Sequence, residues 1–398
     1  MQKDAGSQSA HRDAAFDCLQ RRDFLKSELL FKELIAEGSV DPQDRFGLSM
    51  ALYEQGRLEE CREPLAEACR LEPNFVHAWL YLGVVNERLG LRSPAAGAYL
   101  RADRLMSGTP PASIPPDVRN LLTHGARFLG GEVFGALSAE LTSVARKHGE
   151  ASIARLYHAA EMFSGIKPLR YEHPRWRPGL FYVPGMTPRQ FFEREEFSWI
   201  DAVERQTDVI REELRSALSD KKGFKPYVQY AEGSEEARIW STLNGSTDWS
   251  TLHLARHGKF EEEACARCPK TLETLTAIPD LHDVPGYGPE IMFSVLQPKT
   301  LIPAHRGSVN GRLVVHLPLV VPPNCGYLRV GDEKRSWEEG KLMMFDDTFD
   351  HEAWNGSEHT RVVLIFDVWN PELSIAERDA FRAVLFRAAE FEKELLNS

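Results

Sequence analysis

The sequence predicts an α+β multidomain fold, in which an α-helical repeat array precedes an all-β sandwich or barrel. The first third of the 398-residue chain is rich in Ala, Leu, Arg and Glu at helical spacing. From about Tyr171, short apolar runs alternate with clusters of Gly, Pro, Asn and Asp, which is typical of strands and turns. We therefore expect helical repeats over 1–106, a Pro-rich linker and helical connector over 107–170, and a β-rich domain with a C-terminal helix over 171–398.

Composition limits the classes of function. Hydrophobic residues make up 42% and charged residues 27%, as in ordinary globular proteins, and the formal net charge is −11. Without a long Lys/Arg block, no nucleic-acid partner is expected. No run approaches the roughly 18 apolar residues of a transmembrane segment. The polar N-terminus lacks an apolar signal core, and six cysteines make no disulfide scaffold, so we expect a cytoplasmic protein.

The helical region carries a tetratricopeptide-like (TPR-like) pattern. With Trp79 in the first signature position, matching residues follow at Leu82, Gly83, Ala95, Tyr99 and Ala102. A shift of 34 residues gives a second copy, which contains Leu48, Ser49, Leu52, Cys61, Leu65, Ala68 and Pro73. A third copy near 14–36 is weaker. The pattern predicts stacked helical hairpins, and a generic helical bundle is the alternative.

Proline and periodicity mark where the array ends. The stretch Ser107–Pro116 holds four prolines and no helical period, so we expect the array to end there. Helical spacing returns over 116–166. Further helices are expected at 197–218 and 375–396. The predicted strands are Ile291–Leu296, Leu313–Val321, Leu342–Phe345 and Val362–Trp369.

Two histidines carry the chemical signal. His305 and His351 stand at the ends of apolar, β-rich runs, and Arg361 follows the second by ten residues. This order is what a non-haem iron(II), 2-oxoglutarate-dependent oxygenase needs. Two neutral imidazoles hold the metal ion, and a guanidinium downstream binds the distal carboxylate of the oxoacid.

Strand alternation selects the residues that face such a site. One face of the strand after His305 carries Arg312, Val314 and His316, while Leu313 and its alternate neighbours form an apolar packing face. On the last strand, one face carries Arg361, Val363, Ile365, Asp367 and Trp369. We expect the polar faces to look into the site.

From Ile302 to Leu373, and more loosely from Trp176, the chain resembles the aspartyl/asparaginyl β-hydroxylase family. The resemblance implies a double-stranded β-helix (jelly-roll) oxygenase domain. It also implies an enzyme, a dioxygenase that uses Fe(II), 2-oxoglutarate and O2 to hydroxylate Asp or Asn in a peptide or protein substrate. The repeats would recruit that substrate.

The resemblance also implies the ligand set. His305 and His351 are the metal ligands. The usual pattern has an acidic residue two positions after the first histidine, but this chain has Gly307 there, a loss that the family shares. Water takes the vacant place, and Asp347 orders that water, which gives it a catalytic role. Alternatively, Asp346 and Asp347 both shape the turn before His351. A glycine at this position is also found in halogenases of the oxygenase fold, where it makes room for a halide ion.

The cofactor-binding residues follow in the same way. The resemblance implies that Arg361 and Ser294 bind the distal carboxylate of 2-oxoglutarate and that His316 lies at its 1-carboxylate end. Some members have an arginine where this chain has Val314. Arg312 would replace it only if the backbone shifts.

Two other functions stay open. The domain could oxidise a small molecule or a lipid acyl chain, with the repeats serving another partner. Or the chain could be a non-enzymatic adaptor, which the presence of His305, His351 and Arg361 argues against. The substrate and the oligomeric state are not specified by the sequence.

Overall fold

The computed structural model describes residues 2–220 and 222–397, and these fall into two compact units. One unit contains the described residues of Met1–Ala136, Ser164–Lys167 and Ala388–Ser398. The other contains Leu137–Phe163 and Pro168–Arg387. The first unit is helical, and the second contains both sheets.

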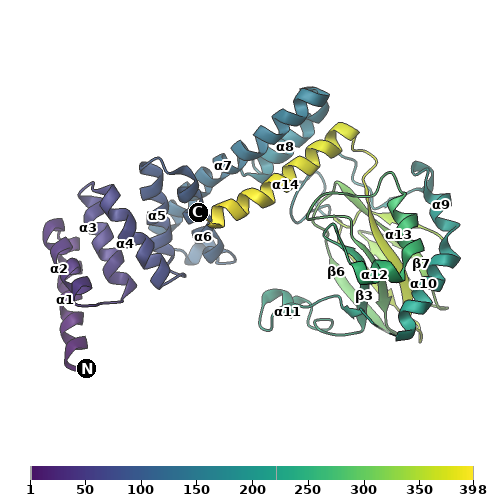
Figure 1. Ribbon diagram of the computed structural model, residues 1–398, viewed down its shortest axis with the longest axis horizontal. Coiled ribbons are helices and arrows are strands. Elements are labelled where there is room, and N and C mark those ends of the chain that lie inside the picture. Colours follow the sequence, from purple (N-terminus) through teal and green to yellow (C-terminus); the bar gives the residue numbers. More distant parts are fainter. Residues whose placement is uncertain (1, 221, 398) are drawn as a thin grey trace. The chain divides into compact units, whose positions relative to one another are not determined.

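Six helices of the first unit form consecutive hairpins (Figure 1). They are α1 (Gln2–Gln20), α2 (Phe24–Ala36), α3 (Pro42–Glu54), α4 (Leu58–Leu71), α5 (Val76–Arg88) and α6 (Arg92–Met106). The second helices of the hairpins begin at Phe24, Leu58 and Arg92, 34 residues apart each time. The predicted repeat period is thus confirmed, and the weak third copy is a complete helical hairpin.

Small residues let the paired helices approach closely. A Cβ atom at Gly83 would lie 2.5 Å from the ring of Tyr99, and one at Gly47 would lie 2.2 Å from the ring of Phe31. Both rings are buried, so a larger residue at either glycine would force the helices apart. The TPR-like signature therefore marks places where large rings fill the space above small residues.

The predicted connector is helical. It consists of η1 (Pro111–Ser113), α7 (Pro116–His148), η2 (Glu150–Ile153) and α8 (Ala154–Phe163). Proline at the start of α7 suits the first turn, where the missing N–H has no helical partner. The boundary between the two units falls inside α7, after Ala136.

The second unit holds two antiparallel sheets. The larger has the order β1-β10-β7-β12-β5-β3-β2, with β4 paired to β3, and the smaller has the order β6-β11-β8-β9. The larger sheet comprises β1 (Phe191–Phe192), β2 (Lys225–Pro226), β3 (Trp249–Arg256), β4 (Lys259–Phe260), β5 (Ile291–Leu296), β7 (Arg312–Val320), β10 (Met343–Phe345) and β12 (Arg361–Trp369). The smaller comprises β6 (Thr300–His305), β8 (Gly326–Val330), β9 (Glu333–Arg335) and β11 (His351–Asn355). The four predicted strands are confirmed to within one residue at each end.

Helices cover one face of the larger sheet (Figure 1). They include α9 (Ile200–Glu204), α10 (Thr207–Asp220), α12 (Glu262–Arg267) and α13 (Pro269–Thr276). Ile210 and Leu214 of α10 share one buried cluster with Leu313, Val315 and other alternate residues of β7. The intervening residues of β7 therefore lie on the opposite face, as the alternation predicted. The remaining helices are η3 (Arg194–Glu196), α11 (Glu235–Ile239) and α14 (Ile375–Asn397).

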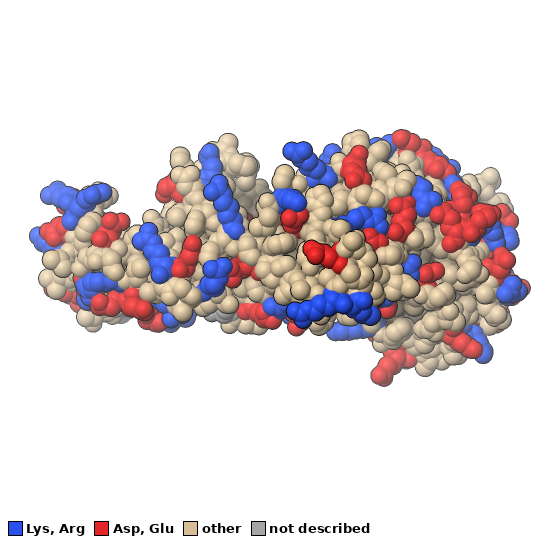
Figure 2. All heavy atoms as spheres, turned by 90° about the horizontal axis from the view of Figure 1, so that it is seen from above, with Lys and Arg blue, Asp and Glu red and all other residues tan. Residues whose placement is uncertain are grey.

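In the described part of the chain, no helix has the length and apolar character needed to cross a membrane. Figure 2 shows positive and negative side chains interspersed on the face that it presents, in keeping with the net charge of −11.

Candidate active site

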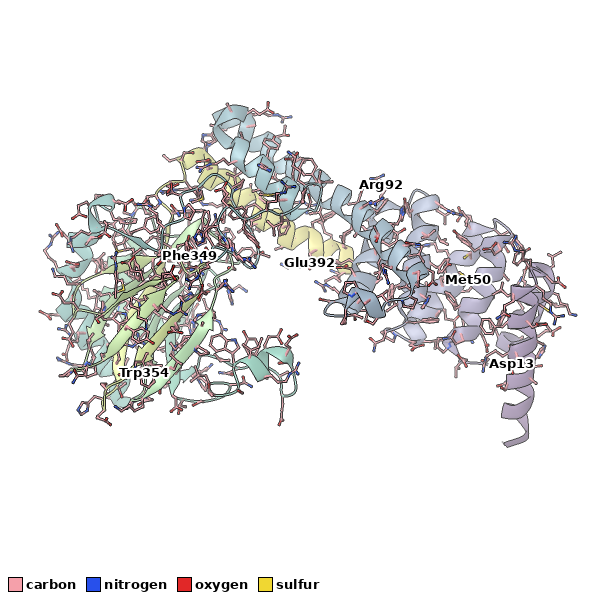
Figure 3. All side chains as sticks on the ribbon, turned by 180° about the vertical axis from the view of Figure 1, so that it is seen from behind. Asp13, Met50, Arg92, Phe349, Trp354 and Glu392 are labelled. Atoms are coloured by element: carbon pink, nitrogen blue, oxygen red, sulfur yellow. The ribbon has the colours of Figure 1, made fainter. Side chains whose placement is uncertain are left out.

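A pair of histidines joins the edge strand β6 of the smaller sheet to its inner neighbour β11. His305 ends β6, His351 begins β11, and the two residues are register partners whose ring centroids lie 4.1 Å apart. Figure 3 labels Phe349 and Trp354, which in the sequence are two residues before and three residues after His351. The antiparallel ladder therefore brings together two residues that are far apart in sequence.

Backbone carbonyl groups orient both rings. His305 Nδ1 lies 2.8 Å from the carbonyl oxygen of Pro303, and His351 Nδ1 lies 3.1 Å from that of Phe349. A carbonyl oxygen only accepts, so Nδ1 carries the proton in each ring and the lone pair resides on Nε2. Burial lowers the pKa of His305 to about 3 and that of His351 to about 4. Both imidazoles are therefore neutral at pH 7, the form that binds a metal ion.

The place two residues after His305 is filled from elsewhere in the chain. A Cβ atom at Gly307 would lie 2.2 Å from Cγ, Oδ1 and Oδ2 of Asp347. The backbone N–H of Gly307 also donates to the carbonyl oxygen of Asp347 at 2.7 Å. The sequence predicted a vacancy here, but the carboxylate of Asp347 occupies the space in which the side chain of a third ligand would begin.

The two adjacent aspartates do different things. Asp346 accepts from Trp176 Nε1 at 2.7 Å and from the backbone and hydroxyl of Thr348, so it holds the turn. Burial raises the pKa of Asp346 to about 7. Asp347 instead lines the cavity, and its Oδ1 has no hydrogen-bond partner among the described residues. The turn-shaping alternative therefore describes Asp346 rather than both residues.

Arg312 is held by two carboxylates. Its Nη1 donates to Asp367 Oδ1 and its Nη2 to Asp347 Oδ2, each at 2.9 Å. Asp367 is the cavity-facing residue of β12 opposite Val314. A guanidinium that is already paired on two sides does not take over the carboxylate contact of the arginine that Val314 replaces.

Arg361 is buried without such partners. It is 1% exposed, and its Nε and Nη1 make no hydrogen bond among the described residues. Its guanidinium lies 4.8 Å from the ring centroid of Trp337. Burial lowers the pKa of Arg361 to about 10, so the group is still charged at pH 7. An unpaired buried charge is costly, and an incoming anion would satisfy it.

Two tryptophans orient the neighbouring polar groups. Trp249 Nε1 donates to Ser294 Oγ at 3.1 Å, and Trp337 Nε1 donates to His316 Nδ1 at 3.2 Å. Because an indole N–H is only a donor, His316 Nδ1 is the acceptor and the ring proton sits on Nε2. Burial, followed by the charge of Arg361, lowers the pKa of His316. His316 is therefore a neutral N–H donor beside the unpaired guanidinium.

All six predicted site residues line one cavity of about 120 Å³. They are Ser294, His305, His316, Asp347, His351 and Arg361. Arg312, Glu290 and Asp367 also line the cavity. The rest of its wall is aliphatic or aromatic and consists of Tyr227, Trp249, Met292, Ile302, Val314, Leu328, Phe345, Ala353 and Ile365. The cavity thus combines two neutral imidazoles with a buried guanidinium that has two unpartnered nitrogens. Among the described residues, this cavity included, no group of three or more His, Cys, Asp or Glu is arranged to hold a metal ion.

Several residues that contribute to the cavity were not predicted from the sequence. The indole of Trp337 contacts both His316 and Arg361, yet Trp337 lies outside every periodic segment. Trp249 begins β3, but its hydrogen bond to Ser294 depends on the pairing of β3 with β5. Glu290 precedes a predicted strand by one residue. Alternation had placed Arg312 and Asp367 on the cavity faces, although not as an ion pair.

The second unit is a β-rich domain whose cavity brings two neutral imidazoles together with a buried guanidinium, and TPR-like hairpins precede it in the chain. Residues 204–371 match the sequence model of the family described as "Aspartyl/Asparaginyl beta-hydroxylase". The resemblance drawn from the motifs is confirmed for this part of the chain.

Three curated relatives match between 45% and 74% of this chain. The "Aspartyl/asparaginyl beta-hydroxylase" of Homo sapiens is 32% identical over 213 residues, which cover 52% of this chain and 26% of that protein. The "Ornithine lipid ester-linked acyl 2-hydroxylase" of Rhizobium tropici is 34% identical over 45% of this chain and 60% of its own length. The "Aspartate beta-hydroxylase domain-containing protein 1" of Mus musculus is 29% identical, over 74% of this chain and 76% of that protein.

Proposed function

We propose that the chain is an iron(II)- and 2-oxoglutarate-dependent dioxygenase that hydroxylates a peptide or protein substrate, with Asp or Asn as the residue that the family indicates. The observation that carries the proposal is one cavity lined by the neutral pair His305 and His351 and by the unpaired, buried Arg361. We further propose that the two sheets together form a double-stranded β-helix, or jelly roll.

Each cofactor has residues that fit it. Nε2 of His305 and of His351 would hold the iron, and Arg361 with Ser294 would bind the distal carboxylate of 2-oxoglutarate. The Nε2–H of His316 would donate to its other end. Iron, 2-oxoglutarate and O2 supply the oxidising chemistry when bound, and the protein supplies position and exclusion of water.

Asp347 favours hydroxylation over halogenation. Its carboxylate fills the space beside Gly307, where a halide ion would have to bind. The unpartnered Oδ1 of Asp347 is an acceptor for a water molecule in the cavity, while Oδ2 is held by Arg312. Asp347 would therefore orient a water molecule that completes the metal site.

A second candidate function is hydroxylation of a lipid acyl chain or another small molecule. The Rhizobium relative carries a lipid-hydroxylase name at 34% identity. Inside the cavity, the wall between the two arginines is apolar at Met292, Val314 and Ile365. Both functions share the same cofactors, so the substrate distinguishes them.

We also propose that the TPR-like hairpins bind an extended peptide. Half-buried aromatic rings connect α3 with α5, because Tyr81 lies 5.8 Å from Phe46 and 5.7 Å from Tyr53 between ring centroids. Aromatic rings that are partly exposed provide contact area at low entropic cost.

The proposal predicts that purified protein converts 2-oxoglutarate to succinate only when iron(II) and oxygen are present. A proteome and a lipid extract would each be incubated with the complete system and searched by mass spectrometry for gain of one oxygen atom. Oxygen incorporated into peptides supports the first candidate and incorporation into lipids the second. A protein that makes no succinate under any of these conditions is the adaptor that we argue against.

A further inference from the structure

We propose that Trp176 is a positioning residue for the metal site, and that it acts through a segment that joins the two loops beside His305 and His351. We call residues 175–181 the bridging segment. The inference rests on the proposed function, because it takes both histidines as metal ligands. It assigns part of the metal affinity to residues that lie far upstream of the first ligand in the sequence.

The bridging segment supplies hydrogen bonds to the loop that follows His305. The N–H of Gly179 donates to the carbonyl oxygen of Gly307 at 3.0 Å. The N–H of Leu180 donates to the carbonyl oxygen of Ser308 at 2.8 Å. The strand β6 ends at His305, so the ladder of the smaller sheet does not extend to these residues. Hydrogen bonds from the bridging segment fix the backbone of this loop in its place.

The same segment holds the turn that precedes His351. Trp176 forms a β-bridge with Phe349, and the two rings are stacked with their centroids 6.3 Å apart. The carbonyl oxygen of Phe349 lies 3.1 Å from His351 Nδ1 and orients that ring. The N–H of Arg177 also donates to the carbonyl oxygen of Thr348 at 3.1 Å. A single residue, Phe349, therefore separates Trp176 from a proposed metal ligand.

The indole N–H of Trp176 reaches a second residue of this turn. It donates to Asp346 Oδ2 at 2.7 Å, while Asp346 Oδ1 accepts from the backbone and hydroxyl of Thr348. A carboxyl group accepts hydrogen bonds in its neutral form as well as in its charged form, so this contact does not depend on ionisation. Trp176 is 0% exposed and Asp346 is 1% exposed. Removal of the N–H therefore leaves a buried oxygen without its donor and loosens the turn that carries Asp347.

Arg175 attaches the bridging segment to the residue next to His351. Its Nε donates to Asp350 Oδ1 at 3.1 Å, and its Nη2 donates to the carbonyl oxygen of Gly331 at 2.9 Å. Asp350 directly precedes His351 and also accepts from Arg329 Nη1 at 2.8 Å. The backbone before His351 is thus held by side chains as well as by the ladder. A ligand whose ring and backbone are both fixed in advance binds a metal ion more tightly.

A role in stability alone is the alternative, and a second buried tryptophan separates the two roles. Trp199 is 5% exposed, and its indole N–H donates to Asp280 Oδ2 at 3.3 Å. Trp199 packs in the apolar cluster on the face of the larger sheet that is turned away from the cavity. Neither Trp199 nor Asp280 lines the cavity. Trp176 and Trp199 therefore share burial and an aspartate acceptor, but Trp176 alone contacts the turn before His351.

The experiment titrates the full-length protein with cobalt(II) under nitrogen, without 2-oxoglutarate, so that metal binding is measured apart from turnover. The visible absorption of bound cobalt(II) reports on its ligands. Trp176→Phe keeps an aromatic ring and removes the N–H. We expect it to raise the Kd for cobalt(II) roughly tenfold, since loss of a group that orients a metal ligand weakens affinity by about 10- to 100-fold. Trp199→Phe should leave this Kd unchanged, and urea unfolding measures the stability of both variants.

Arg175→Gln is the second variant, and it decides the question if Trp176→Phe does not fold. Arg175 is half-buried, and the substitution removes its charge-assisted contact with Asp350. It should also raise the Kd for cobalt(II). The matched control is Arg194→Gln, because Arg194 is also half-buried and pairs with Glu204 at 3.1 Å outside the cavity lining.

Cobalt(II) affinity that is equal in the wild type, Trp176→Phe and Arg175→Gln overturns the inference. An equal loss of affinity in Trp176→Phe and Trp199→Phe also overturns it, because the loss would then follow from stability. Iron-dependent succinate formation by the wild type is measured in the same preparation. Succinate formed by a protein whose variants bind cobalt(II) equally refutes the inference alone. A wild type that binds no cobalt(II) and forms no succinate refutes the proposed function, and the inference with it.

Discussion

Two arginines of the larger sheet, Arg312 and Arg361, line the same cavity but differ in their hydrogen-bond partners. Arg312 on β7 gives each of two nitrogens to a carboxylate at 2.9 Å. Arg361 on β12 has two nitrogens, Nε and Nη1, without a partner among the described residues. A paired buried guanidinium contributes to the architecture of the protein. An unpaired one costs stability, and that cost is explained if the residue is kept for a ligand.

The largest effect on activity is expected for the two proposed metal ligands, His305 and His351. His351→Ala should abolish iron-dependent succinate formation, because one imidazole cannot replace two and Gly307 offers no side chain as a spare ligand. The matched control is His359→Ala, a histidine on the same segment whose side chain is exposed. Turnover near the wild-type rate in the His351 variant would refute the ligand assignment.

Substitution of Arg312 and of Arg361 should have different effects on the free energy of unfolding of the cofactor-free protein. Arg312→Met should lower the free energy of unfolding by about 3–5 kcal/mol, because it leaves Asp347 and Asp367 buried without their cation. Arg361→Met removes an unpaired charge, so it should leave stability unchanged or raise it. Urea unfolding measures both. Equal losses in the two variants would mean that the arginines do not differ in role.

For 2-oxoglutarate binding, in contrast to stability, we expect the larger effect from substitution of Arg361. Arg361→Ala should weaken 2-oxoglutarate binding roughly tenfold or more, since a charge-assisted contact is worth about 1.5–3 kcal/mol, while iron binding is retained. Calorimetric titration of each ligand checks this. Arg306→Ala is the control, because Arg306 follows a metal ligand but is exposed and outside the cavity lining. Unchanged 2-oxoglutarate affinity would contradict the role of Arg361.

The smallest effect is expected at Gly307. A Cβ atom there would lie 2.2 Å from the carboxylate of Asp347, so Gly307→Ala should displace that carboxylate and cost about 1–3 kcal/mol of stability. Gly307→Asp adds a second charge at the same place and should not accelerate succinate formation. An aspartate variant faster than the wild type would show that Asp347 is not needed where it stands.

Patterns of fixed period were predictable from the sequence. The 34-residue shift located the hairpins, and alternation placed Arg312 and Arg361 on the cavity faces. The differing roles of Asp346 and Asp347 were not predictable, because neighbours in sequence share every local signal and only the fold separates Trp176 from Arg312 as their partners. The state of each arginine likewise depends on distant residues, which no local pattern encodes.

The register of the histidine pair has a kinetic consequence. His305 belongs to β6, an edge strand of the smaller sheet, whereas His351 belongs to β11, which is flanked on both sides. An ion bound by both rings would crosslink the edge strand to an inner one, beyond the hydrogen bonds of the ladder. We expect amide hydrogen exchange along Leu301–Ala304 to slow when metal binds and to quicken on chelation. The rate at which β6 opens would then measure the fraction of the protein that has metal bound.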